Sequence, residues 1–130
     1  MFQWYYRYKV VSYIRNCLNT IRGSGMEDQI YSYHAEMCKV LSHPKRLEII
    51  NTLRDKEMSA GDLGERLGLS PATLSQHLAM MKERRMLLSR KEGNMVYYRI
   101  ANPRMLEAFD LLREILFEQI RQDAAMIDGR

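Results

Sequence analysis

The sequence predicts a mainly α-helical domain with one small β-hairpin, and three features carry this prediction. Apolar residues recur at steps of three and four along most of the chain, which is the spacing of buried helix faces. The stretch MLLSRKEGNMVYYRI, residues 86–100, instead places β-branched and aromatic side chains around a Glu-Gly-Asn tip, as in a hairpin. The length of 130 residues and the hydrophobic content of 46% fit one soluble domain with a small core.

The stretch RGSG, residues 22–25, is predicted to be a flexible joint. It divides the chain into an N-terminal extension, residues 1–25, and a domain, residues 26–130. The extension carries an apolar stripe at helical spacing, so a short amphipathic helix is expected there. We favour docking of this stripe on the domain over contact of the aromatic and basic residues 4–9 with a membrane surface.

Capping residues mark the helices that lie between the extension and the hairpin. Ser42 is predicted to cap a helix with Pro44 in its first turn. Ser59 is expected to begin the next helix, and Gly68 to end it in a left-handed conformation. Ser70 is then expected to cap a further helix only two residues later.

A last helix is expected after the hairpin, with Asn102 as its cap and Pro103 in its first turn. The predicted order is therefore helix, helix, helix–turn–helix, hairpin, helix. This order is that of a winged helix-turn-helix domain, in which the second helix of the pair enters the DNA major groove.

The stretch LSPATLSQHLAMMK, residues 69–82, is the predicted recognition helix. Leu74, Leu78 and Met81 form its buried face, and its other positions carry short or medium hydrogen-bonding side chains. Such side chains can approach base edges and both donate and accept. The DNA contacts predicted from this helix are Ser70, Thr73, Ser75, Gln76, His77 and Lys82.

The charge distribution also favours DNA as the partner. Residues 42–104 hold twelve basic and seven acidic residues, whereas residues 26–41 and 105–130 are both acidic. A basic middle segment suits a polyanion. Contacts with the DNA backbone are predicted from the hairpin, by Arg90, Lys91, Asn94 and Arg99, and with less support from Lys45 and Arg46.

Three stretches together resemble the ArsR/SmtB family of bacterial and archaeal transcriptional repressors, over about residues 30–120. They are LSHPKRLEIINTL, LSPATLSQHLAMMKERRML and RKEGNMVYYRI. The most specific matches are Ser70, Ser75, His77 and Leu78 in the recognition helix and Gly93, Tyr97, Tyr98 and Arg99 in the wing. The resemblance implies a homodimer that pairs through its first and last helices, blocks transcription from its operator, and releases the DNA on a metal or stress signal.

The hydrophobic stripes of the first and last helices are too long for one small domain to cover, which also favours a homodimer. Two recognition helices would then read a pseudo-palindromic operator whose halves are about 34 Å apart. The residues predicted to form the dimer interface are Ile30, Tyr33, Met37, Met105, Phe109, Leu112, Leu116 and Ile120.

The metal sites of the family are not expected in this chain. The stretch EMSAGDL has Ser59 and Gly61 where the family's arsenic and cadmium sites have cysteines, and the last helix has no histidine. No metal and no cofactor are therefore predicted. Cys17 and Cys38 remain: we favour structural cysteines, with Cys38 among core residues, over a redox-sensing pair and over a metal site shared with His34.

The sequence thus predicts a DNA-binding transcriptional regulator, a repressor that occludes a promoter and is released by an unidentified signal. The alternative is a winged helix that binds a protein and has no preferred DNA sequence. An enzyme is not expected, because no catalytic triad, carboxylate pair or phosphate-binding loop stands out. No long apolar run and no secretory signal occur, so a cytoplasmic protein without a membrane partner is expected.

Overall fold

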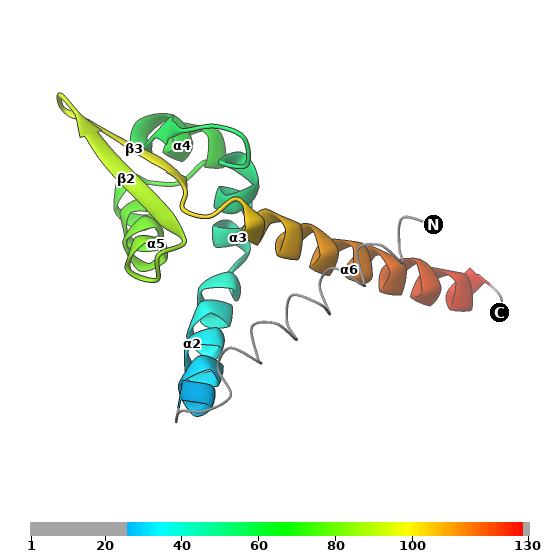
Figure 1. The fold of residues 1–130 in the computed structure, drawn as a ribbon. Coiled ribbons are helices and arrows are strands. Elements are labelled where there is room, and N and C mark those ends of the chain that lie inside the picture. Colours follow the sequence, from blue (N-terminus) through cyan, green and yellow to red (C-terminus); the bar gives the residue numbers. More distant parts are fainter. Residues whose placement is uncertain (1–25, 129–130) are drawn as a thin grey trace. The chain divides into compact units, whose positions relative to one another are not determined.

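The computed structural model describes residues 26–128, and the predicted extension, residues 1–25, lies outside the described residues. The chain divides into two compact units, residues 1–39 and 40–130, each of which is described by itself. The prediction of a mainly helical fold with a small hairpin is confirmed. The elements, in order, are α2 (Met26–Leu41), α3 (Pro44–Thr52), β1 (Met58–Ser59), α4 (Ala60–Leu67), α5 (Pro71–Glu83), β2 (Leu87–Glu92), β3 (Met95–Ile100) and α6 (Arg104–Asp128) (Figure 1).

Local capping sets the helix-turn-helix pair formed by α4 and α5. The Ser59 hydroxyl accepts from the Asp62 amide (3.1 Å) and donates to the Asp62 carboxylate (2.8 Å), which begins α4. Gly68 ends α4 with φ +63°, a left-handed conformation that favours glycine. Ser70 caps α5 by accepting from the Thr73 amide at 3.2 Å. The predicted starts of both helices and the turn between them are confirmed.

The cap of α3 differs from the prediction by one residue. His43, not Ser42, occupies the cap position, and its Nδ1 accepts from the Lys45 amide at 3.1 Å. Pro44 is the first helical residue, and the residue before a proline is held extended. The cap must therefore be the residue that directly precedes Pro44, which places Ser42 too early in the chain.

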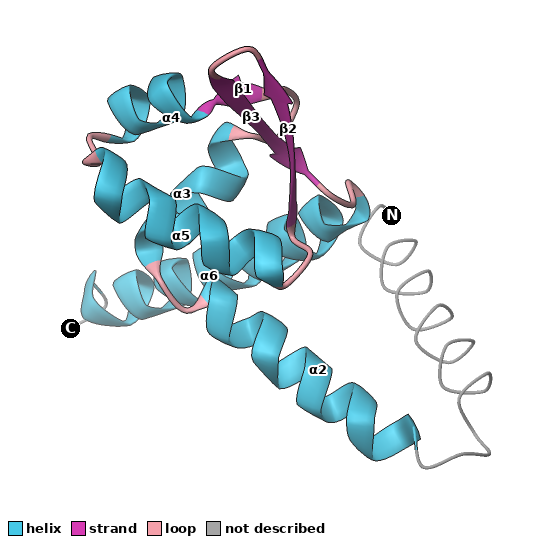
Figure 2. Cartoon of the chain, turned by 90° about the vertical axis from the view of Figure 1, so that its left-hand side faces the viewer, coloured by secondary structure: helices cyan, strands magenta, loops and turns pink. Residues whose placement is uncertain are grey.

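The hairpin belongs to a three-stranded antiparallel sheet with the strand order β1-β3-β2. Strands β2 and β3 pair from Leu87–Ile100 at the base to Glu92–Met95 at the tip, where Gly93 turns the chain with φ +59°. The third strand, β1, was not predicted, because two residues are too short for a period-two pattern. Figure 2 shows the sheet at the edge of the domain, beside α3, α4 and α5.

The core lies between α3, α4, α5 and the base of the sheet. Gly64 of α4 allows the two helices of the pair to pack closely, since a Cβ on this residue would lie 3.2 Å from Leu74 and 3.3 Å from the Leu69 carbonyl oxygen. The buried apolar side chains come from these elements, their flanking residues and the end of α2: Val40, Ile49, Ile50, Leu53, Leu63, Leu74, Leu78, Met81, Met86, Leu87 and Ile100.

Among residues 26–128, helix α6 packs against this core through its first turns. Met105, Leu106 and Phe109 pack against the core. The Arg54 guanidinium donates to both carboxylate oxygens of Asp110, at 2.7 and 2.6 Å. Figure 1 shows the rest of α6 extending away from α4 and α5. None of the helices within residues 26–128 is both long enough and apolar enough to span a membrane.

Candidate nucleic-acid interface

Helix α5 presents one polar face and buries the other, as its sequence pattern predicts. Leu74, Leu78 and Met81 are at most 2% exposed. Ser75 and Gln76 are exposed on the turns between them. Small and flexible neighbours, Ala72, Ala79 and Met80, are also exposed and leave little bulk on this face. A helix with such a face can approach base edges closely.

Two predicted DNA contacts in the first turn of α5, Ser70 and Thr73, have different roles: Ser70 caps the helix, and Thr73 can still donate a hydrogen bond. The Ser70 hydroxyl accepts from the Thr73 amide and donates to the Thr73 hydroxyl oxygen at 2.9 Å. Its hydrogen-bonding capacity is therefore largely used within the helix. Thr73 is exposed, and its own hydroxyl hydrogen remains available for an acceptor such as a phosphate oxygen.

His77 is half-buried and lies against the start of α3. Its ring centre is 4.6 Å from that of His43, with the planes tilted by 52°. Burial lowers the pKa of His77, and the neighbouring His43 and Arg46 lower this pKa further. The neutral ring keeps one donor and one acceptor nitrogen. Contact between His77 and DNA stays a prediction.

Lys45 and Arg46 both make contacts within the domain. Lys45 Nζ donates to the Glu48 carboxylate at 2.9 Å and to the Leu67 carbonyl at 3.4 Å, which links α3 to the end of α4. Arg46 Nε donates to the Val40 carbonyl at the end of α2. These contacts give both side chains a role in joining helices, and their predicted phosphate contacts stay predictions.

The wing is defined as β2, β3 and the turn at residues 93–94, and its basic residues differ in whether they form ion pairs. Arg90 is paired with Glu57 and Glu92 and lies over the Tyr97 ring at 4.5 Å. Hydrogen bonds from Arg90 to Glu57 first, and then to Glu92, raise the pKa of Arg90. Among the described residues, Lys91 and Arg99 have no ion-pair partner, and both are exposed, as is Asn94 at the tip. Lys82 near the end of α5 is exposed as well.

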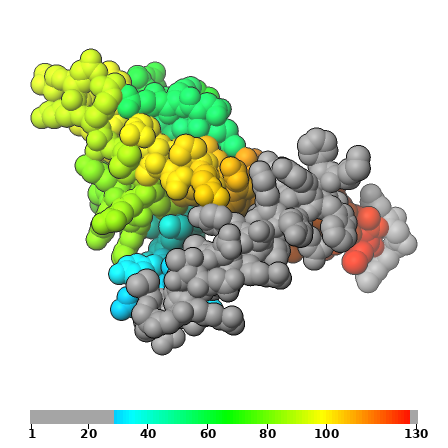
Figure 3. Space-filling view, in the orientation of Figure 1, coloured from blue at the N-terminus to red at the C-terminus, as the bar shows by residue number. Residues whose placement is uncertain are grey.

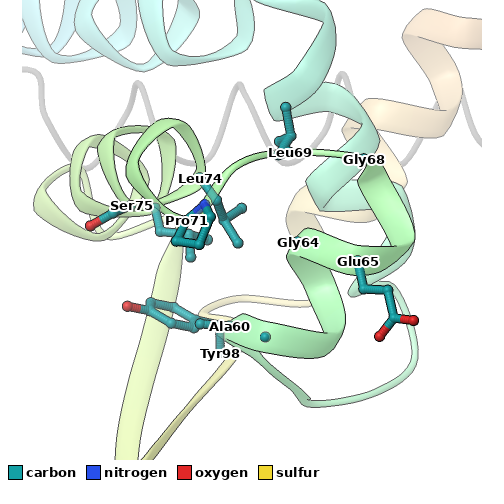
Figure 4. Close-up of a pocket in the computed structure, with 11 residues that line it drawn as sticks. Ala60, Gly64, Glu65, Gly68, Leu69, Pro71, Leu74, Ser75 and Tyr98 are labelled. Carbon is teal, nitrogen blue, oxygen red and sulfur yellow. The ribbon is translucent and has the colours of Figure 1, made fainter.

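A hollow of about 540 Å³ lies between α4, α5 and Tyr98 of β3. It exists because Gly61, Gly64 and Gly68 leave one side of α4 without side chains. Figure 4 shows Leu74 reaching towards this side, whereas the Ser75 hydroxyl and the Glu65 carboxylate point away from it. The hollow is mainly apolar, and it brings the sheet next to the start of α5.

The predicted dimer residues fall into two groups. Ile30, Tyr33 and Met37 of α2 are exposed. On α6, Met105 and Phe109 pack against the core of their own domain. The remaining three, Leu112, Leu116 and Ile120, are 54%, 48% and 62% exposed, so a long apolar face of α6 lies open on the single chain.

Cys38 is exposed, so the expectation that it lies among core residues is wrong. The apolar face of α2 is exposed up to Met37, and the first buried side chain of this helix is Val40. Cys17, its predicted redox partner, lies outside the described residues. Within residues 26–128, no three His, Cys, Asp or Glu side chains gather as a metal site would require.

Three contributors to this interface were not predicted from the sequence: Glu57, Gly64 and the pair formed by Arg54 and Asp110. Glu57 and Arg90 are 33 positions apart, and Arg54 and Asp110 are 56 positions apart. No local pattern marks such pairs. For Gly64, its place on the buried face of a predicted helix was a usable signal, since a glycine there indicates close packing.

The polar face of α5, the glycine turn before it and the wing after it define a winged helix-turn-helix DNA-binding regulator. Residues 43–88 match the sequence model of the bacterial regulatory protein arsR family. The transcriptional activator HlyU of Vibrio cholerae is 34% identical over 79 residues, which cover 61% of this chain and 73% of HlyU. The chain belongs to the ArsR family of transcriptional regulators.

Two further proteins agree with this assignment. The biofilm growth-associated repressor of Xylella fastidiosa (strain Temecula1) is 32% identical over 88 residues, which cover 68% of this chain and 77% of the repressor. The solution structure of a homodimeric winged helix-turn-helix domain from Mycobacterium bovis, a possible ArsR-family regulator, superimposes with a TM-score of 0.70. It is 25% identical, and the match covers 78% of this chain and 94% of the Mycobacterium domain.

Proposed function

We propose that the protein is a homodimeric, non-catalytic repressor that binds a pseudo-palindromic operator in the cytoplasm and blocks the promoter there. The observation that carries this proposal is the exposed polar face of α5, held in a fixed orientation by the Ser70 cap and the Gly68 turn. A repressor and an activator are both named among its relatives, so the direction of regulation is itself part of the proposal.

Base reading is assigned to Ser75 and Gln76, because both are exposed on the face opposite the buried stripe of α5. Gln is suited to a bidentate contact with adenine. Phosphate contacts are assigned to Thr73 at the start of the helix and Lys82 near its end, because both are exposed; such contacts would fix the register of the helix on the duplex.

Dimerisation is assigned to the open apolar faces of α2 and α6. A monomer that exposed Leu112, Leu116 and Ile120 to water would lose the hydrophobic stabilisation that pairing supplies. The homodimeric neighbour supports this assembly. Two copies would present two α5 helices, which is what a pseudo-palindromic operator requires.

The test is binding of the full chain to duplex DNA from upstream of its own gene, measured by fluorescence anisotropy, with a random duplex as reference. Gln76→Ala is expected to weaken binding to the specific duplex by about 1–3 kcal/mol per half-site and to relax the preference at one base pair in each half-site. The control is Gln122→Ala, an exposed glutamine of α6 that lies outside the predicted DNA contacts and should bind as the wild type does.

An equal loss on the specific and random duplexes would contradict base reading by Gln76. If the wild-type chain binds both duplexes equally weakly and releases them at moderate salt, the proposed function fails. The alternative of a protein-binding winged helix then becomes the better interpretation.

A further inference from the structure

Arg90 joins all three strands of the sheet. It stands on β2, an outer strand, and its Nε and Nη2 atoms lie 2.7 and 2.6 Å from Oε1 of Glu57. Glu57 directly precedes β1, the other outer strand. Between them the guanidinium covers the ring of Tyr97 on the central strand β3, at 4.5 Å from the ring centre. Nη1 pairs with Glu92 near the tip.

The pairing register places Arg90 and Lys91 on opposite faces of the hairpin. Arg90 is opposite Tyr97, whereas Lys91 is opposite Val96, two residues from Tyr98. Side chains alternate along a strand, so Lys91 shares a face with Tyr98. Tyr98 lines the hollow beside the start of α5 (Figure 4), and the wing stands out from the surface in Figure 3. Lys91 therefore lies on the face turned towards the recognition helix, and Arg90 lies on the other face.

The carboxylates around Arg90 argue against a direct phosphate contact. Glu57 and Glu92 supply two negative charges to one guanidinium. If Arg90 turned to a phosphate, both carboxylates would be left without this cation beside a polyanion, which is unfavourable. A two-stranded hairpin is marginally stable by itself, so a connection from its outer strand to Glu57 restricts its motion.

We propose that Arg90 is a positioning residue: the cluster of Glu57, Arg90, Glu92 and Tyr97 holds the wing rigid, and Lys91 on the opposite face makes the phosphate contact. The proposal rests on the proposed DNA-binding function and assigns different roles to two neighbouring cations. Isolated exposed ion pairs contribute little to overall stability, so the effect is expected in the wing and not in the global unfolding transition.

Glu57→Gln distinguishes a positioning role of Arg90 from a direct phosphate contact, because the two roles predict opposite changes in DNA affinity. The substitution removes a negative charge, so electrostatics alone would tighten DNA binding. A positioning role for Arg90 predicts weaker binding, by about 3- to 10-fold, with an unchanged dependence of log K on log salt. Glu83→Gln makes the same charge change at the exposed end of α5 and measures the purely electrostatic effect. Tighter binding by Glu57→Gln with a steeper salt slope would show Arg90 released to the DNA and would overturn the proposal.

Alanine variants of the two cations complete the binding test. Lys91→Ala is expected to reduce the salt slope by about 1.8, because each of the two wings of the proposed dimer loses one phosphate contact worth about 0.9. Arg90→Ala should weaken binding and leave the slope as in the wild type. A reduced slope for Arg90→Ala together with an unchanged slope for Lys91→Ala would also overturn the proposal.

Amide hydrogen exchange measured without DNA tests whether Glu57 and Arg90 order the wing, and this result does not depend on the proposed DNA-binding function. Glu57→Gln should increase amide exchange in residues 87–100 and leave exchange in α3 and α5 unchanged. Unchanged exchange in the wing contradicts the positioning role even where DNA binding is intact. Conversely, a wild-type chain that binds no DNA contradicts the proposed function, and the exchange data still decide whether Glu57 orders the wing.

Discussion

At the scale of single residues, the pair of His43 and His77 joins two helices through a contact between their rings. His43 uses its Nδ1 atom to cap α3, and the ring of His77 from α5 lies 4.6 Å away, close to the Arg46 charge. Neither ring can gain a proton without adding positive charge to this contact. The stability of the contact between α3 and α5 should therefore depend on pH.

The first prediction concerns the pKa of His77, which burial and its neighbours lower from 6.5. The folded state thus favours the neutral ring. Its contribution to stability is complete above the unfolded pKa and is lost as the pH falls through the folded pKa. His77→Gln should therefore lose less stability than the wild type between pH 7.5 and 5, measured by urea unfolding. His34→Gln, at an exposed position of α2, is the control and should follow the wild type; an equal pH dependence in all three proteins would contradict the prediction.

At the scale of elements, the distance between α4 and α5 is set by a missing side chain. Gly64 lies where the Leu69 carbonyl and the Leu74 side chain approach α4 most closely, and Gly68 supplies the left-handed turn that brings them there. The orientation of the DNA-facing helix thus depends on two glycines with different physical roles. One provides space, and the other provides backbone freedom.

The second prediction compares two glycines of the same helix. Gly64→Ala should destabilise the domain by about 1–3 kcal/mol, because the new methyl group meets a backbone oxygen and a buried leucine. Gly61→Ala should instead stabilise it by about 0.5 kcal/mol, since outside its chain neighbours and its own helix backbone the new Cβ meets only Ser59 Oγ, at 4.0 Å, and alanine favours helix. Thermal and urea unfolding measure both effects. A neutral Gly64→Ala would mean that the turn at Leu69 shifts without cost.

At the scale of the whole molecule, the link between α6 and the helix-turn-helix would set how far apart the two α5 helices stand in the proposed dimer. Arg54 forms the bidentate pair with Asp110 and lies over Phe109 at 6.0 Å. The Arg113 guanidinium also lies over the Phe109 ring, at 5.5 Å from its centre, and donates to the Asn51 side-chain oxygen at 3.3 Å. These polar contacts fix the angle at which α6 leaves α3.

The third prediction is that Asp110→Asn weakens operator binding by about 3- to 10-fold and broadens the tolerated spacing between half-sites, because the angle of α6 is less restricted. The measurement is anisotropy on duplexes whose half-sites are moved apart by one base pair at a time. Sedimentation should show an unchanged dimer. Asp123→Asn, an exposed position further along α6, is the matched control. A spacing preference identical to that of the wild type would show that the pair does not set this angle.

Much of the candidate site follows from signals within a few residues. The caps at Ser59 and Ser70, the turn at Gly68, the buried stripe of α5 and the Gly93 tip are all read from the sequence, because each depends on backbone geometry within one or two turns. These signals give the order of elements and the polar face of α5. They also carry the family resemblance that the comparisons confirm.

Only the tertiary structure decided which of the polar side chains have interaction partners within the domain. Arg90 and Lys91 are adjacent in sequence and equally basic, yet one meets Glu57 across the sheet and the other has no ion-pair partner among the described residues. His77 lies against His43, and β1 exists because β3 is there to pair with it. The sequence by itself determined helices, turns and hairpin, since these form through local contacts. The partners of individual charges depend on residues 33 and 56 positions apart, which only folding brings together.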